Sequence, residues 1–207
     1  MKTMIAKVAP FAVVLSPGLH DTGPGSWLSI WQDAAGRAGH HWHRVVQSDW
    51  DDPDPDQWTE ALAATVEEAG NASPALLIGH SLGALTIARA ALSGVLGPVA
   101  GAFLVAPPDT GQHLTVEEIA RWGEGPWGTL PFPSALVASR DDPWCGYAHA
   151  ATLARSWGAR LMDADAAGHI TAEDGHGPWP EGQDMLRDFA TVLNGPMQGL
   201  SPGSAEV

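Results

Sequence analysis

The stretch ALLIGHSLG, residues 75–83, decides the fold that this sequence predicts. Its first four residues are apolar, as expected of a β-strand that is covered on both faces. A run rich in Ala and Leu, residues 84–92, follows and is typical of a helix. A strand, a sharp turn and a helix, with the pattern G-x-S-x-G at the turn, are what a nucleophile elbow requires. Ser81 would then expose its hydroxyl above the sheet, while Gly79 and Gly83 leave room for close packing of strand and helix.

Short apolar runs alternate with helical patterns along the rest of the chain, which indicates an α/β protein with a mainly parallel sheet. The expected strands cover residues 12–16, 44–47, 75–80, 101–106, 134–139 and 160–163. The expected helices cover residues 27–38, 57–69, 82–92, 147–157 and 183–193. We therefore expect one domain over residues 1–195, with roughly six strands and with helices on both faces of the sheet. Residues 196–207 are expected to form a flexible tail.

Composition excludes several classes of protein. The 207 residues are 44% hydrophobic, which suits one globular domain with a sizeable core. A net charge of −14 argues against nucleic acid and anionic membrane surfaces as partners. The apolar run at residues 8–15 is too short for a membrane span, contains Pro10 and lacks a signal-peptidase site. A single cysteine excludes an internal disulfide framework, and we expect a cytoplasmic protein.

A serine hydroxyl becomes a nucleophile when a base takes its proton and a carboxylate orients that base. Downstream of Ser81, two strand ends carry such groups: SRDDP at residues 139–143 and AGH at residues 167–169. The carboxyl ends of parallel strands meet at one edge of an open α/β sheet, which is where such folds build their sites. The order serine, acid, histidine along the chain also fits a nucleophile elbow.

Each strand end offers two candidates. Asp142 precedes a proline, which favours an extended backbone, and we choose it over Asp141, partly on the resemblance given below. His169 directly follows a turn glycine soon after its strand, so we choose it over His176 in the same loop. Asp141 and His176 stay open as alternatives.

Two backbone N–H groups are expected to bind an oxyanion: that of Leu82, after the nucleophile, and that of Leu19, in the loop after the first strand. The candidate substrate-binding residues lie in or near the loops: His20, Trp27, Trp144 and His176. The segment between the fourth and fifth strands, residues 107–133, has room for one short helix near residues 116–122. It offers Leu114, Trp122, Trp127 and Phe132 as a shallow cover.

Three other features favour ordinary explanations. The segment HHWH, residues 40–43, lacks a carboxylate or cysteine at metal-ligand spacing. The acidic run at residues 49–56 is punctuated by proline and is expected to be a solvated loop. Cys145 lacks a base of its own, whereas Ser81 has the elbow context. No metal and no cofactor are expected.

These motifs together resemble the small serine hydrolases of the α/β-hydrolase superfamily that include the retinoblastoma-binding serine hydrolase and many short bacterial relatives. The resemblance runs from about residue 11 to residue 195. It rests on PG at 17–18, GPGSW at 23–27, DW at 49–50, GHSLG at 79–83, VAP at 105–107, SRDDPWC at 139–145 and GHI at 168–170.

The resemblance implies a compact hydrolase without a large cap domain. It further implies that Ser81, Asp142 and His169 form a catalytic triad acting on small esters or amides through an acyl-enzyme. An asparagine often stands two residues after the histidine in this family, whereas Thr171 stands there in this chain. No L-x-C-x-E segment is present, and no protein partner is expected.

Two other functions remain open. One is a non-catalytic binding protein on the same fold, against which the complete set of triad candidates argues. The other is acyl transfer, or cleavage of a thioester or C–C bond, which a pocket that excludes water would favour. The fold alone does not decide between them.

Overall fold

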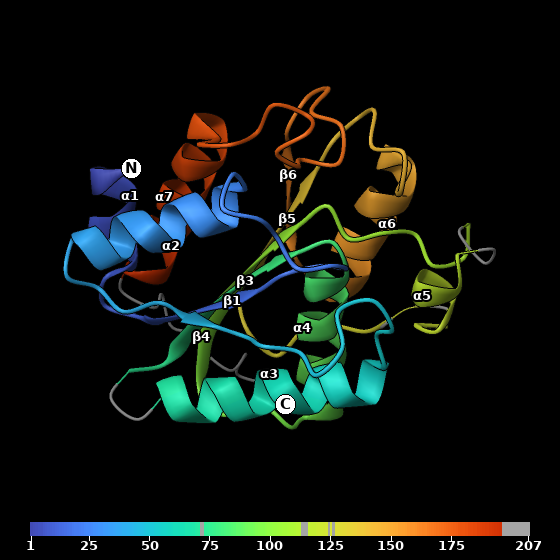
Figure 1. The fold of residues 1–207 in the computed structure, drawn as a ribbon, viewed down its shortest axis with the longest axis horizontal. Coiled ribbons are helices and arrows are strands. Elements are labelled where there is room, and N and C mark those ends of the chain that lie inside the picture. The colour runs from blue at the N-terminus through green and yellow to red at the C-terminus, as the bar shows by residue number, and fades with distance from the viewer. Residues whose placement is uncertain (71–72, 113–115, 124, 126, 196–207) are drawn as a thin grey trace, which may run out of the picture.

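A computed structural model describes residues 1–70, 73–112, 116–123, 125 and 127–195. Within these residues, parallel strands form one six-stranded sheet in the order β2-β1-β3-β4-β5-β6 (Figure 1). The strands are β1 (Ala12–Ser16), β2 (His43–Arg44), β3 (Ala75–His80), β4 (Val99–Val105), β5 (Ser134–Ala138) and β6 (Arg160–Asp163). The helices are α1 (Lys2–Val8), α2 (Trp27–Arg37), α3 (Pro55–Ala69), α4 (Leu82–Ser93), α5 (Glu117–Ala120), α6 (Tyr147–Trp157) and α7 (Pro180–Leu193). The predicted α/β class is confirmed, and no separate cap domain is present in the described part of the chain.

Helices cover both faces of the sheet and enclose two hydrophobic cores. Helices α3, α4 and α6 pack on one face, and α1, α2 and α7 pack on the other (Figure 1). Alternate residues of the central strand β3 point to opposite faces, so that Leu77 enters the first core while Leu76 and Ile78 enter the second. In the described residues, no helix is both long and apolar enough to cross a membrane.

Most predicted elements are found, and their differences lie mainly at element ends. Helix α1 was not predicted; it buries Met4, Ile5 and Val8 and lies against α7. Helix α3 begins two residues earlier than predicted, because the Asp54 side chain accepts the N–H groups of the first turn. Strand β2 is shorter than predicted and leaves the sheet before Val46, which is 72% exposed.

The segment between β4 and β5 contains the predicted short helix, α5, but its aromatic residues do not cover the main cavity. Trp122 is buried against Trp58 in the core under α3, and Trp127 lies with Trp122 at a separate small hollow. Phe132 packs on the same core. Leu114 lies outside the described residues. The expected aromatic cover is therefore wrong for these three side chains.

Candidate active site

Ser81 follows the last residue of β3 and precedes the first residue of α4. Its backbone has φ 54° and ψ −126°, a region that residues with a Cβ rarely adopt. The surrounding glycines explain how this turn packs. A Cβ on Gly83 would lie 1.9 Å from the Ser16 carbonyl oxygen, and one on Gly79 would lie 2.7 Å from Ile87. Strand and helix can therefore approach closely only because both positions lack side chains.

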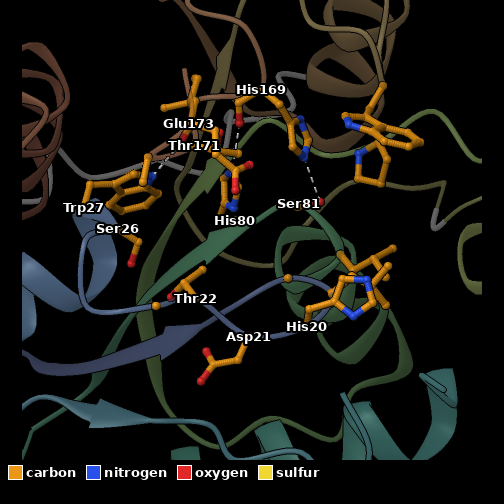
Figure 2. A pocket seen from close by; sticks show the side chains of 18 of the residues that line it. His20, Asp21, Thr22, Ser26, Trp27, His80, Ser81, His169, Thr171 and Glu173 are labelled. Carbon is orange, nitrogen blue, oxygen red and sulfur yellow. Dashed lines mark hydrogen bonds between the residues drawn. The ribbon is translucent and has the colours of Figure 1, made fainter. Parts of the chain in front are cut away.

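A chain of hydrogen bonds connects Ser81, His169 and Asp142. The Nε2 atom of His169 lies 3.0 Å from the Ser81 hydroxyl, a contact drawn as a dashed line in Figure 2. Its Nδ1 atom lies 3.0 Å from both carboxylate oxygens of Asp142. Because a carboxylate only accepts, Nδ1 carries the proton and Nε2 is free to accept one from the serine. The Asp142 side chain is 2% exposed and also accepts the Trp144 N–H at 2.8 Å.

The neighbouring carboxylate, Asp141, has different partners. It accepts hydrogen bonds from the Ser139 hydroxyl at 2.7 Å and from the Gly168 N–H at 2.8 Å. These two hydrogen bonds, that of Ser139 first, hold the pKa of Asp141 below its usual range. Of the two candidate acids, Asp142 is therefore the one that contacts His169, whereas Asp141 joins the loop after β5 to the loop that carries His169.

The loop that carries His169 is held from within by Asp174. One carboxylate oxygen of Asp174 accepts the N–H groups of His169 and Thr171, at 3.0 and 3.1 Å. The same oxygen accepts the Thr171 hydroxyl at 2.8 Å. The threonine that replaces the family's asparagine thus takes part in the hydrogen bonding of this loop. Sequence reasoning missed Asp174, although a threonine followed three residues later by an aspartate is a recognisable local hydrogen-bonding pair.

Two further titratable side chains lie near the serine. Burial lowers the pKa of His80 to about 3, so its ring is neutral, and its Nε2 atom lies 2.9 Å from the His169 carbonyl oxygen. Burial, followed by the charge of Asp142, raises the pKa of the Cys145 thiol to about 12. A buried thiol with such a pKa is protonated at neutral pH and is a poor nucleophile.

Leu19 and Leu82, the predicted oxyanion donors, both line the cavity with Ser81. Leu82 is the first residue of α4, where an N–H group has no acceptor within the helix. In the described residues neither N–H donates a hydrogen bond to a backbone carbonyl. The next N–H in the first loop, that of His20, donates to the Trp50 carbonyl. A Cβ on Gly18 would lie 2.8 Å from the Cβ of Ser81, so this loop passes directly against the serine.

The cavity beside Ser81 has a volume of about 620 Å³. The loop after β1, helix α5 and the loop after β6 form its walls. Three of the four predicted substrate-binding residues line it: His20, Trp27 and Trp144. His176 does not, because its N–H turns back to the Thr171 carbonyl and its ring lies against Trp179. The structure therefore does not place His176 at this cavity, and its role in binding substrate stays a prediction.

The charged lining of the cavity is acidic. Asp21, Glu118 and Glu173 reach it, and no lysine or arginine of the described chain does. Asp21 is paired with Arg44 beneath the first loop. In the described residues no three His, Cys, Asp or Glu side chains are grouped so that they could hold a metal ion. The cavity therefore combines a serine within hydrogen-bond distance of a histidine with apolar and acidic walls.

Solved structures of other proteins share the fold of this chain. The chain is 32% identical to a protein described as a YdeN-like hydrolase from Pectobacterium atrosepticum, covering 93% of this chain and 97% of that one with a TM-score of 0.79. The ydeN gene product of B. subtilis is 18% identical over 86% of this chain and 98% of its own, with a TM-score of 0.68. Est1E from Butyrivibrio proteoclasticus, solved with ferulic acid bound, shares the fold with a TM-score of 0.66. It is 13% identical, over 87% of this chain and 88% of its own. No curated protein matches the chain.

The match to a family model is more direct evidence, because it covers residues 13–188. This range includes all of the sheet except the first residue of β1, and all three residues of the Ser81 hydrogen-bond chain. The model is that of the serine hydrolases. The protein belongs to the serine hydrolase family.

Proposed function

We propose that this protein is a carboxylesterase-like enzyme that hydrolyses small esters through an acyl-enzyme on Ser81. The observation that carries the proposal is the unbroken chain of hydrogen bonds from Ser81 through His169 to the buried Asp142, at the wall of a cavity. A binding protein would have no need to hold a serine in a strained turn against an oriented histidine. The proposal includes Ser81, His169 and Asp142 as the catalytic triad.

In the first half of the reaction, His169 Nε2 takes the proton of Ser81 as the serine oxygen attacks the ester carbonyl. The negative charge on the tetrahedral oxygen is bound by the N–H groups of Leu82 and Leu19. His169 then gives its proton to the departing alcohol oxygen as the C–O bond breaks, which leaves the acyl group on the serine. Asp142 holds the His169 tautomer and stabilises its cation throughout.

In the second half, a water molecule takes the place of the alcohol. His169 removes one proton from it as its oxygen attacks the acyl carbonyl. When the intermediate collapses, the proton returns to Ser81 and the carboxylic acid is released. The atoms of one ester and one water balance those of one alcohol and one acid, and no cofactor enters any step.

The cavity favours small substrates. A volume of about 620 Å³ lies within the range of roughly 300–1,000 Å³ that is usual for small-molecule sites. Helix α5 is only four residues long and contributes Ile119 to the wall. Such a wall is too small to form a deep acyl channel. Small amides, whose carbonyl would meet the same groups, are the second candidate class.

The test is active-site labelling with a fluorophosphonate, followed by peptide mass spectrometry. The wild-type protein should be labelled on Ser81, and Ser81→Ala should not react. The same preparations should hydrolyse p-nitrophenyl acetate in the wild type only. Equal labelling of the Ser81→Ala variant would show that another residue is the nucleophile. Saturable binding of esters without turnover would instead favour a binding protein.

A further inference from the structure

The loop that carries His169 is held from outside through two consecutive backbone carbonyls. The Nε2 atom of His80 lies 2.9 Å from the His169 carbonyl oxygen, across 89 positions of sequence. The indole N–H of Trp27 donates to the Ile170 carbonyl at 3.0 Å, across 143 positions. Figure 2 shows both contacts as dashed lines beneath the loop. The loop is thus attached to the nucleophile turn by one side chain and to the start of α2 by the other.

The backbone of this loop needs such support. Ile170 has φ 57°, which is unfavourable for any residue with a branched Cβ, and Gly168 before it has the same φ. The Ile170 side chain is fully buried in the core under α2 and α7. A strained conformation persists only where its surroundings determine it. The His169 carbonyl lies directly before the strained φ bond of Ile170 and the Ile170 carbonyl lies directly after it, so the two hydrogen bonds can hold this conformation.

Both donors are themselves fixed. A carbonyl oxygen only accepts, so the neutral ring of His80 must carry its proton on Nε2. The rings of His80 and Trp27 meet edge to face at 5.8 Å. Trp27 is 1% exposed and packs against both Trp31 and Trp179, whose ring centres lie 4.7 and 5.0 Å away. Neither donor can move without disturbing a packed core.

We propose that His80 and Trp27 are positioning residues that hold the His169 loop so that the imidazole stays within hydrogen-bond distance of Ser81. The inference rests on the proposed function, since positioning has an effect on rate only if His169 is the base. Trp27 would then position the His169 loop in addition to lining the cavity. A base held 3.0 Å from its nucleophile loses efficiency steeply when its backbone shifts.

The experiment compares variants that lose one donor with matched controls. Trp27→Phe removes the indole N–H but keeps an aromatic ring, and His80→Leu removes the ring donor. Trp31→Phe is the control, because Trp31 lies on the same helix and also donates to a carbonyl, that of Pro178, away from His169. His80→Gln is the conservative variant, because its side-chain amide can reach the same carbonyl with an N–H.

We would measure the second-order rate constant of fluorophosphonate labelling together with the melting temperature. Trp27→Phe and His80→Leu should be labelled about tenfold more slowly than the wild type, the effect of losing one well-placed hydrogen bond. The melting temperature of Trp31→Phe should fall by a similar amount, but its labelling rate constant should fall less than twofold. His80→Gln should recover most of the rate that His80→Leu loses.

Two outcomes of the rate measurements would overturn the proposal: equal rates for Trp27→Phe and Trp31→Phe, or a His80→Gln variant as slow as His80→Leu. A separate readout needs no activity. Long-range ¹H–¹⁵N spectra of the histidine rings should show His80 as the Nε2–H tautomer, and an Nδ1–H tautomer would also refute the proposal. A wild-type protein that is not labelled on Ser81, but shows the Nε2–H tautomer, would instead refute the proposed function alone.

Discussion

Replacing Asp142 by asparagine should reduce kcat by roughly 10⁴, because it places the wrong group opposite His169. One Asp142 oxygen accepts the Trp144 N–H at 2.8 Å, so the amide oxygen of the asparagine will occupy that position. Its NH₂ group then faces His169 Nδ1 at the 3.0 Å now spanned by the second oxygen. The amide oxygen also lies near Nδ1 but is already engaged by the Trp144 N–H, whereas the NH₂ group can donate to Nδ1 only when the ring proton is on Nε2. The substitution therefore favours the Nε2–H tautomer. The protonated Nε2 can no longer accept the proton of Ser81.

The matched control is Asp141→Asn. A single oxygen of Asp141 accepts both the Ser139 hydroxyl and the Gly168 N–H, and an amide oxygen can accept the same two donors. We therefore expect kcat to fall tenfold or less in Asp141→Asn. The 10⁴-fold fall expected for Asp142→Asn corresponds to about 5.5 kcal/mol of lost transition-state stabilisation.

The assay is steady-state hydrolysis of p-nitrophenyl acetate, with the folded fraction checked by circular dichroism. Both variants should remain folded, because each keeps the size of the side chain. Equal losses in the two variants, or a larger loss in Asp141→Asn, would refute the tautomer argument. A loss in Asp142→Asn below about 100-fold would mean that this carboxylate does not set the tautomer.

Three further predictions concern substrate length, backbone space and pH. In a series of p-nitrophenyl esters, kcat/KM should be higher for the acetate or butyrate than for the decanoate. A deep acyl channel would instead raise kcat/KM about fourfold with each added carbon of the acyl chain. Gly18→Ala should lower kcat/KM by about tenfold or more, since its Cβ would lie 2.8 Å from that of Ser81, while Gly36→Ala, with open space around it, should not. The pKa of His80 is about 3 in the fold against 6.5 unfolded, so the unfolded chain binds an extra proton between these values. The free energy of unfolding, measured with urea, should therefore fall as pH drops from 6.5 towards 3, and this fall should be smaller in His80→Gln.

The strands of the sheet, and the strand ends that carry the candidate site residues, could be predicted because they follow from local patterns. Apolar runs mark strands covered on both faces, and the carboxyl ends of parallel strands meet at one edge. Ser81 and Asp142 follow such runs, and His169 follows the shorter and more polar strand β6. Their meeting point is a consequence of topology, and it needs no knowledge of individual side-chain contacts.

The supports of the site could not be predicted in the same way. The bonds from His80 and Trp27 to the His169 loop are made to backbone carbonyls, which every residue has, so no residue type at the accepting end gives a signal. Sequence reasoning chose His169 as the base but also placed His176 among the substrate-binding residues, whereas in the structure His176 N–H bonds to the Thr171 carbonyl and His176 does not line the cavity. Helix α1 was missed because its seven residues are stabilised by packing on α7 rather than by their own propensity.

Backbone strain in this protein is concentrated where the chemistry is proposed. In the described part of the chain, the non-glycine residues with positive φ are His20, Asp21, Ser81, Ala106, Asp165, Ile170 and Trp179. All of them lie between the carboxyl end of a strand and the next helix, and Trp179 directly precedes α7. The sheet beneath them is fully buried at its centre, and each strained turn begins from a strand that neighbours hold in register. The free energy of that core therefore offsets the cost of turns that place Ser81 and His169 face to face. Glycine at Ile170 would relieve the strained φ but would also remove a fully buried side chain, so it should lower the melting temperature and leave His169 less firmly held.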